Sequence, residues 1–542
     1  MDTLPPHISS PDFAIVLQEL AEVVGEDWVF SSPEDRALYN DSYSPFAVEP
    51  SLQLLASAAV APASVEQVQH VVRVANKHKV PLYAFSTGRN LGYGGSSPTQ
   101  SGSVVIDLKR MNRVLEVNEE QGYVVVEPGV SFIELYRYLE AHGHPFMVAT
   151  PEPGWGSPVG NALDHGISFV LGDNFASVRG LEVVLPSGEI LRTGMGALPN
   201  DRLWHAFPYG FGPYVNGLFS QSNFGIVTKM GFSLVRKPEM QAAFSVSSSR
   251  SDDLHPLLAT IQTMREQGLL YLSSAASPLR SPMAPPGEPT PAHTRRAREL
   301  LYRRDGGTSQ EWDQLSRESG IAVSVVIGNV RGPSRIVEAT LEYAREQFAK
   351  IPGTEFRVDS ARRFPLDVDD IPPDVRPQFG IPSLWPFASL ALGDTRRGMY
   401  FFSPVCRATA EDLFAIRQTI REVVLDHADE SMRDPFLGWI LANTVYPKAF
   451  IFAYPFAISD DASINRKARE LFTRLVEACG EKGWGEYRSH VAFQSTVMKQ
   501  YSFNDHALRR FLESMKDAID PNGILAPGKS GIWPKRFRES QA

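Results

Sequence analysis

Three glycine-rich loops carry the residue types that bind a diphosphate. The first, residues 85–95 (FSTGRNLGYGG), follows a short apolar run. Its glycines permit left-handed backbone and a close approach of N–H groups to an anion. Residues 151–166 and 219–227 have the same small, polar composition. The first loop alone fits a plain glycine-rich turn as well as a phosphate cradle, but the three together predict one extended ligand across a loop face.

The sequence does not support either of two common nucleotide-binding sites, the P-loop and the Rossmann dinucleotide site. Residues 523–530 (GILAPGKS) match the P-loop pattern letter by letter. A P-loop needs a strand before it and a helix after it, and Pro527 stands where backbone N–H donors are required. The chain also lacks GxGxxG, which disfavours a Rossmann dinucleotide site.

The loops need rigid elements around them, and the flanking sequence alternates strands and helices. Apolar periodicity predicts a helix over 62–78, opened by Ser64, and a hairpin over 180–193. Further strands are expected at 54–60, 81–85, 103–107, 123–126, 323–330, 398–405 and 440–454, and further helices at 12–25, 334–350, 409–427, 461–480 and 505–518. This order favours an α+β chain with more than one domain.

Composition excludes several classes of protein. The 542 residues carry 53 basic and 62 acidic side chains, a formal charge of −9, which argues against nucleic-acid binding. Two cysteines, Cys406 and Cys479, make neither a disulfide scaffold nor a cysteine-rich metal site, so we expect no metal. Neither a secretory signal nor a spanning apolar run is visible, so we expect a cytoplasmic protein without a membrane partner.

In this order, the three loops resemble the flavin-binding domain of the vanillyl-alcohol oxidase and para-cresol methylhydroxylase (4-cresol dehydrogenase) family, near its eugenol oxidase-like members. Residues 485–493 (GEYRSHVAF) and 521–532 (PNGILAPGKSGI) resemble the family's C-terminal signatures. The resemblance implies an α+β, two-domain PCMH-type FAD-binding fold with a cap, or substrate, domain. The implied parts are 1–240 for FAD binding, 241–485 for the cap, and 486–542 returning to the FAD-binding domain.

The resemblance also implies FAD as cofactor and assigns residues to it. The pyrophosphate and ribityl chain would be contacted by the first two loops, the adenine side by the third, and the flavin or its phosphates by Lys529. The implied cofactor residues are Ser86, Thr87, Gly88, Arg89, Asn90, Leu91, Ser157, Gly160, Asn161, Ser222, Gly225, Ile226, Val227 and Lys529.

The family's phenol-binding trio maps onto Tyr93, Tyr487 and Arg488. A phenol must lose its proton to push electrons toward its para side chain, and a fixed guanidinium with two hydroxyl donors stabilises the phenolate. The ring then releases hydride from its benzylic carbon to flavin N5 and leaves a quinone methide. The competing interpretation is that the three side chains only pack a domain seam.

Glu152 occupies the position where vanillyl-alcohol oxidases carry an aspartate. The resemblance implies that its carboxylate activates water for attack on the quinone methide or hydrogen-bonds flavin N5. Because glutamate is one methylene longer, hydroxylation, desaturation and alcohol oxidation all stay open. A surface glutamate in a salt bridge is the plain alternative.

Two further departures concern the cap. Many relatives bind flavin covalently through a His or Tyr ahead of the strand expected at 398–405, but residues 386–398 contain neither. We therefore predict non-covalent FAD. Gly438 and Pro447 stand where the cresol-hydroxylase branch has polar residues, so Phe401 and Phe402 are candidates for a more apolar pocket wall.

The leading hypothesis is FAD-dependent oxidation of para-substituted phenols, namely 4-alkylphenols and 4-hydroxybenzylic or allylic alcohols. The electron acceptor is molecular oxygen or another acceptor, and relatives suggest a homodimer or larger homo-oligomer. Two alternatives stay open: an FAD-dependent dehydrogenase of a 2-hydroxy acid or sugar, and a non-catalytic flavin-binding protein. The role of His490 is also open between orienting Arg488, approaching the flavin and a structural contact.

Overall fold

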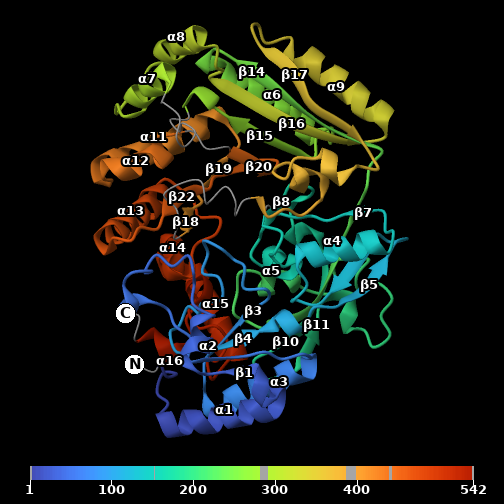
Figure 1. The fold of residues 1–542 in the computed structure, drawn as a ribbon, viewed down its shortest axis with the longest axis vertical. Helices are drawn as coiled ribbons and strands as arrows, with labels where there is room; N and C mark the ends of the chain where they lie inside the picture. Colours follow the sequence, from blue (N-terminus) through green and yellow to red (C-terminus); the bar gives the residue numbers. More distant parts are fainter. Residues whose placement is uncertain (1–2, 152, 281–290, 386–397, 439–441, 540–542) are drawn as a thin grey trace.

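The computed structural model describes residues 3–151, 153–280, 291–385, 398–438 and 442–539, and it shows the α+β architecture that the sequence predicts (Figure 1). Two small sheets from the N-terminal part lie below a large sheet from the middle of the chain in Figure 1. Within the described residues, no helix combines the length and the apolar composition needed to cross a membrane.

The first sheet has the order β1-β2-β4-β3 and places the first glycine-rich loop. Its strands are β1 (Val29–Phe30), β2 (Ala58–Val60), β3 (Leu82–Phe85) and β4 (Val104–Asp107), of which β2, β4 and β3 run parallel. Strands β2 and β4 are fully buried, as expected for a parallel sheet covered on both faces.

Two helices cover this sheet. Helix α1 (Ser10–Val24) packs against α3 (Val65–His78), which begins where Ser64 Oγ accepts the N–H of Gln67 at 3.3 Å. Helix α3 is rich in valine, which lowers its intrinsic helix propensity. Its periodic buried face against the sheet therefore stabilises it.

The second sheet is antiparallel, with the order β11-β10-β12-β6-β5. Its strands are β5 (Val114–Asn118), β6 (Tyr123–Val126), β10 (Val178–Val184), β11 (Ile190–Arg192) and β12 (Ile226–Ser233). The predicted hairpin is the β10–β11 pair. Helix α4 (Phe132–Ala141), which we did not predict, begins in a capping box formed by Ser131 and Glu134.

The large sheet has the order β17-β14-β16-β15-β20-β21-β19. Its strands are β14 (Met240–Ser248), β15 (Leu272–Ala276), β16 (Ser324–Gly332), β17 (Glu355–Arg363), β19 (Val405–Arg407), β20 (Ala442–Tyr446) and β21 (Ala449–Ile451). Helices α6 (Leu254–Glu266) and α9 (Ser334–Phe348) pack against it, and α11 (Ala410–His427) and α13 (Ala462–Glu481) form a further layer.

Two predicted elements of this region differ in the structure. The strand expected at 398–405 is divided into β18 (Met399–Phe402), which pairs with β22 (Tyr454–Ala457), and β19 in the large sheet. Pro404 lies at the break and has no N–H to continue a ladder. Strands β14, β15 and β17 were not predicted.

The C-terminal segment packs onto the N-terminal sheets. After helix α15 (Phe503–Ile519), residues 524–526 lie alongside β3, where Leu82 N–H donates to Ile524 O at 2.7 Å. Leu525 lies in the same apolar core as β2 and β4. Residues 523–530 therefore lack the strand–loop–helix arrangement of a P-loop, and the prediction that they are not a P-loop is confirmed. The domain boundaries at 240 and 485 stay predictions.

Candidate functional site

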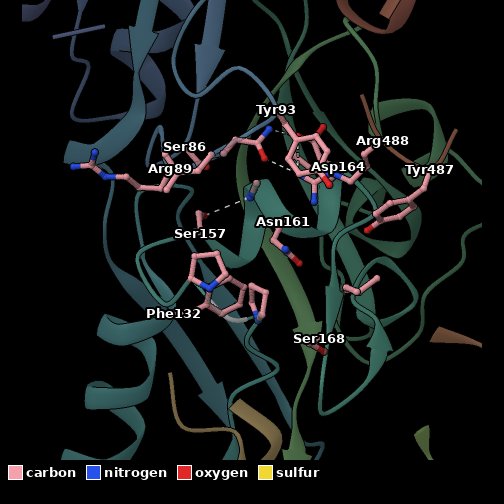
Figure 2. Close-up of a pocket in the computed structure, with 18 of the residues that line it drawn as sticks. Ser86, Arg89, Tyr93, Phe132, Ser157, Asn161, Asp164, Ser168, Tyr487 and Arg488 are labelled. Atoms are coloured by element: carbon pink, nitrogen blue, oxygen red, sulfur yellow. Dashed lines mark hydrogen bonds and ion pairs between the residues drawn. The ribbon is translucent and has the colours of Figure 1, made fainter. Parts of the chain in front are cut away.

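One cavity of about 950 Å³ lies where the two N-terminal sheets, the large sheet and the C-terminal segment meet (Figure 2). Its volume is in the range of small-molecule and cofactor sites. The predicted site residues that line it are Ser86, Thr87, Gly88, Arg89, Asn90, Leu91, Tyr93, Ser157, Gly160, Asn161, Ser222, Gly225, Ile226, Val227, Tyr487, Arg488 and Lys529. Glu152 lies outside the described residues. The individual roles stay predictions.

The large sheet forms the upper wall by strand alternation. In β14, Phe244 and Val246 are buried toward the helices, whereas Ala243 lines the cavity. In β16, Ile327 and Asn329 line the cavity in the same way. The sheet therefore has one face in the apolar core and one face toward a ligand, because successive side chains alternate between faces.

Glycine makes the close approach of two loops possible. Gly88 and Gly92 have φ of +67° and +79°, a region that other residues rarely adopt. A Cβ on Gly160 would lie 2.4 Å from Ser86 Oγ, so the first and second loops touch only because residue 160 has no side chain. Ser157 Oγ accepts the Gly160 N–H at 3.4 Å and donates to Pro128 O at 2.7 Å, which orients the second loop.

The structure brings the predicted trio together at one end of the cavity (Figure 2). The Arg488 guanidinium carbon lies 4.2 Å from the centre of the Tyr93 ring and 5.9 Å from that of Tyr487. The Tyr93 ring also stacks on Phe401 at 5.5 Å. Tyr487 N–H donates to Ser403 O at 2.9 Å. This bond holds the segment with Tyr487 and Arg488 against the break between β18 and β19.

Both tyrosines of the trio stay protonated in the neutral pH range. Burial raises the pKa of Tyr93, and the nearby Arg488 charge opposes this only in part. Burial likewise raises the pKa of Tyr487, whose hydroxyl donates to His165 O. The two hydroxyls are therefore hydrogen-bond donors, whereas Arg488 supplies the fixed positive charge.

Sequence reasoning missed Asp164, which connects the trio to Lys529. Its carboxylate accepts Asn90 Nδ2–H at 3.0 Å and Lys529 Nζ–H at 3.2 Å, and it lies 3.9 Å from Arg488 Nη2. Burial opposes ionisation of Asp164, but the Lys529 and Arg488 charges outweigh it and lower its pKa. Asp164 stands inside the second glycine-rich loop, but no local signal shows that cations from the C-terminal segment face it.

Gln221 is a second residue that the sequence did not single out. Its side-chain amide donates to Asp164 O at 3.3 Å and to Tyr487 O at 3.1 Å. It therefore joins the second and third loops to the segment that carries Tyr487 and Arg488. Its neighbour Ser222 was predicted on the loop pattern alone.

Two other predictions concern side chains around the trio. Phe401 lines the cavity, as expected, whereas Phe402 is fully buried in the core of the large sheet. The Nδ1 of His490 accepts the Ala492 N–H at 3.1 Å, so its Nε2 carries the proton and donates to Asp41 Oδ2 at 2.7 Å. Both His490 and Asp41 side chains are almost fully buried, so His490 makes a structural contact to the N-terminal part.

The cavity suits FAD in charge and shape. The charged side chains among its described lining residues are Arg89, Arg488 and Lys529 against Asp164 and Asp359, an excess of positive charge. A diphosphate complements this excess. Because Gly160 has no side chain, Ser86 and the second loop lie close together in the cavity lining.

Comparisons with known proteins point to flavoproteins. Residues 56–194 match the model of the FAD binding domain family. The flavoprotein subunit of 4-cresol dehydrogenase [hydroxylating] from Pseudomonas putida is 30% identical over 98% of this chain and 97% of its own length. A solved 4-ethylphenol oxidase from Gulosibacter chungangensis, in complex with isoeugenol, is 32% identical over 99% of this chain and 100% of its own, with a TM-score of 0.82. A p-cresol methylhydroxylase structure with substrate bound is 27% identical over 98% and 99% of the chains, with a TM-score of 0.81.

Proposed function

Because this chain belongs to the vanillyl-alcohol oxidase and 4-cresol dehydrogenase family of FAD-dependent oxidoreductases, we propose that it oxidises para-substituted phenols. The PCMH-type fold and the FAD cofactor predicted from the sequence are confirmed. The single observation that carries the proposal is the convergence of Arg488, Tyr93 and Tyr487 on the cavity that the predicted FAD residues also line.

FAD, when bound, would supply the acceptor for a hydride from the benzylic carbon of the phenol. Ser86, Ser157 and Asn161 are proposed to hold its pyrophosphate and ribityl chain, and Lys529 its flavin or phosphates. These side chains contribute binding and orientation, whereas the redox chemistry belongs to the cofactor.

Arg488 and the two tyrosines prepare the substrate. The Arg488 guanidinium favours the phenolate form of a bound phenol, and the protonated hydroxyls of Tyr93 and Tyr487 donate to its oxygen. In the structure the Tyr487 hydroxyl donates to His165 O instead, so binding requires it to exchange this acceptor for the substrate oxygen. Phe401, stacked on Tyr93, supports the aromatic ring of the substrate.

Glu152 is proposed to activate the water that adds to the quinone methide. Met399, Ile451 and Phe452 give the cavity wall an apolar part, which suits an alkyl or allylic para substituent. We further propose that FAD binds non-covalently. Acid precipitation of the holoprotein should then leave a colourless pellet and a yellow supernatant, and a yellow pellet would contradict this.

Anaerobic mixing of the holoenzyme with a substrate panel tests the function. We expect 4-alkylphenols and 4-hydroxybenzylic alcohols to bleach the visible absorption of the flavin, and the products to carry a benzylic hydroxyl, alkene or carbonyl group. Bleaching by 2-hydroxy acids or sugars but not by phenols would show the alternative dehydrogenase. Bleaching by dithionite alone would show a non-catalytic flavin-binding protein.

A further inference from the structure

We propose that Asp164 is a positioning residue of this site, whose single negative charge sets how strongly the cavity attracts anions. It holds Arg488 through Asn90 and holds Lys529 directly. The inference rests on the proposed function, because the anions concerned are a bound phenolate and the charge that the flavin gains on reduction.

Asn90 transmits the position of Asp164 to Arg488. Arg488 Nη2–H donates to Asn90 Oδ1 at 2.5 Å, and Asn90 Nδ2–H donates to Asp164 at 3.0 Å. The carboxylate therefore fixes which end of the Asn90 amide faces the guanidinium, because a carboxylate accepts hydrogen bonds and cannot donate them. Without it, the Asn90 amide is free to turn its donor side toward Arg488.

Arg488, Lys529 and Asp164 form a charged cluster of two cations and one anion. Lys529 Nζ lies 3.2 Å from one Asp164 oxygen and Arg488 Nη2 lies 3.9 Å from the other, so one carboxylate is shared between them. All three side chains are largely buried, with exposed fractions between 12% and 20%. Charges interact strongly at such sites because solvent screens them little.

Burial shifts the pKa of three other titratable groups beside these side chains toward the neutral form. Burial raises the pKa of Glu486 well above its ordinary value, and burial lowers the pKa of His165. The pKa of the buried Tyr83 beside Lys529 is raised by burial. Asp359, the other described acid of the cavity wall, accepts from Arg357 Nε at 2.7 Å and from Ser245 at 3.0 Å on the edge of the large sheet. Asp164 is thus the anion that faces both cations in the described part of the cavity.

The charge of Asp164 has two opposite effects, one on the cost of holding the two cations together and one on the binding of anions. It lowers the net charge of the cluster to +1, which limits the cost of keeping Arg488 and Lys529 together while the cavity contains no anion. The same charge weakens the attraction of the cavity for a phenolate and for a reduced flavin. Removing it should favour both anions.

The test compares Asp164→Asn with Asp164→Glu, in the holoenzyme. The first removes the charge and keeps the shape and an acceptor for Asn90, whereas the second keeps the charge. One readout is the midpoint potential of the bound flavin. The other is the pKa of bound 4-nitrophenol, a phenol without benzylic hydrogens, followed by its phenolate absorption. Asp359→Asn is the matched control, because it removes a carboxylate of the same cavity that contacts neither cation.

We expect Asp164→Asn to lower the pKa of the bound phenol by about one unit, which is about tenfold in phenolate affinity. The flavin potential should rise by a comparable factor, about 30 mV for a two-electron couple. Asp164→Glu, which keeps the charge, should give values close to those of the wild type. Asp359→Asn should leave both values unchanged. A role in folding alone would lower thermal stability without moving either value.

Unchanged values in Asp164→Asn, shifts of opposite sign, or equal shifts in Asp359→Asn would overturn the inference. If Asp164→Asn does not fold, Asp164→Ser removes the same charge with a smaller side chain and is judged by the same readouts. Failure of the proposed function looks different, because phenols would then neither bind nor reduce the wild-type flavin. A raised potential in Asp164→Asn would still support the role of Asp164 toward the flavin in that case.

Discussion

Replacing Arg488 with methionine should slow the reduction of the flavin by a phenol about a thousandfold. Two unit charges about 4 Å apart at an effective dielectric constant of about 20 interact by about 4 kcal/mol, or about three pKa units. The Arg488 side chain is 12% exposed and its guanidinium faces the Tyr93 ring at 4.2 Å, so a phenolate beside it meets this low-dielectric environment. Methionine keeps an unbranched apolar stem but removes the guanidinium group and its charge.

The assay is anaerobic rapid mixing with a 4-alkylphenol across a range of pH. In the variant, the rate should rise about tenfold per pH unit toward the ordinary phenol pKa of about 10, whereas the wild-type rate should level off at lower pH. Arg110→Met is the control, because the Arg110 guanidinium also lies over an aromatic ring, that of Trp28 at 3.7 Å, but Arg110 is not among the residues that line the cavity. A loss below tenfold, or a pH profile equal to that of the wild type, would refute the electrostatic role of Arg488.

Three other predictions follow from single contacts. Lys529→Met should weaken FAD binding at least about tenfold in a titration of the apoprotein, whereas the exposed Lys535→Met should not; equal affinities would contradict this. Because burial raises the pKa of Glu486, its contribution to stability is complete below the unfolded pKa of about 4.3 and is lost as the pH rises through the folded value. The thermal midpoint of the wild type should therefore fall relative to that of Glu486→Gln as the pH rises above about 4, and a constant difference between the two midpoints would disprove this. Lys516→Met removes the lysine counter-ion of the buried Asp520 carboxylate and should lower the free energy of unfolding by about 3–5 kcal/mol in a denaturant titration; a loss within error would exclude a role for the pair in stability.

Local periodicity predicted the elements whose burial follows a simple pattern. Helix α3 and the β10–β11 hairpin lie where the sequence predicted them, because capping residues and turn residues act over three or four positions. Strands β14 and β17 were missed, because one face of each meets a cavity or solvent and carries small or charged residues. Their strand character comes from pairing in the sheet rather than from their own composition.

By itself, the sequence determined the small-residue loops, the order of the motifs and the residue types of the trio, because these depend on chain-local chemistry and on family resemblance. Only the tertiary structure decided which charges meet. Arg488 and Asn90 stand 398 positions apart in the chain, yet they share a hydrogen bond that Asp164 completes. No pattern along the chain encodes such a contact, because it arises where the returning C-terminal segment closes a cavity that the N-terminal loops opened.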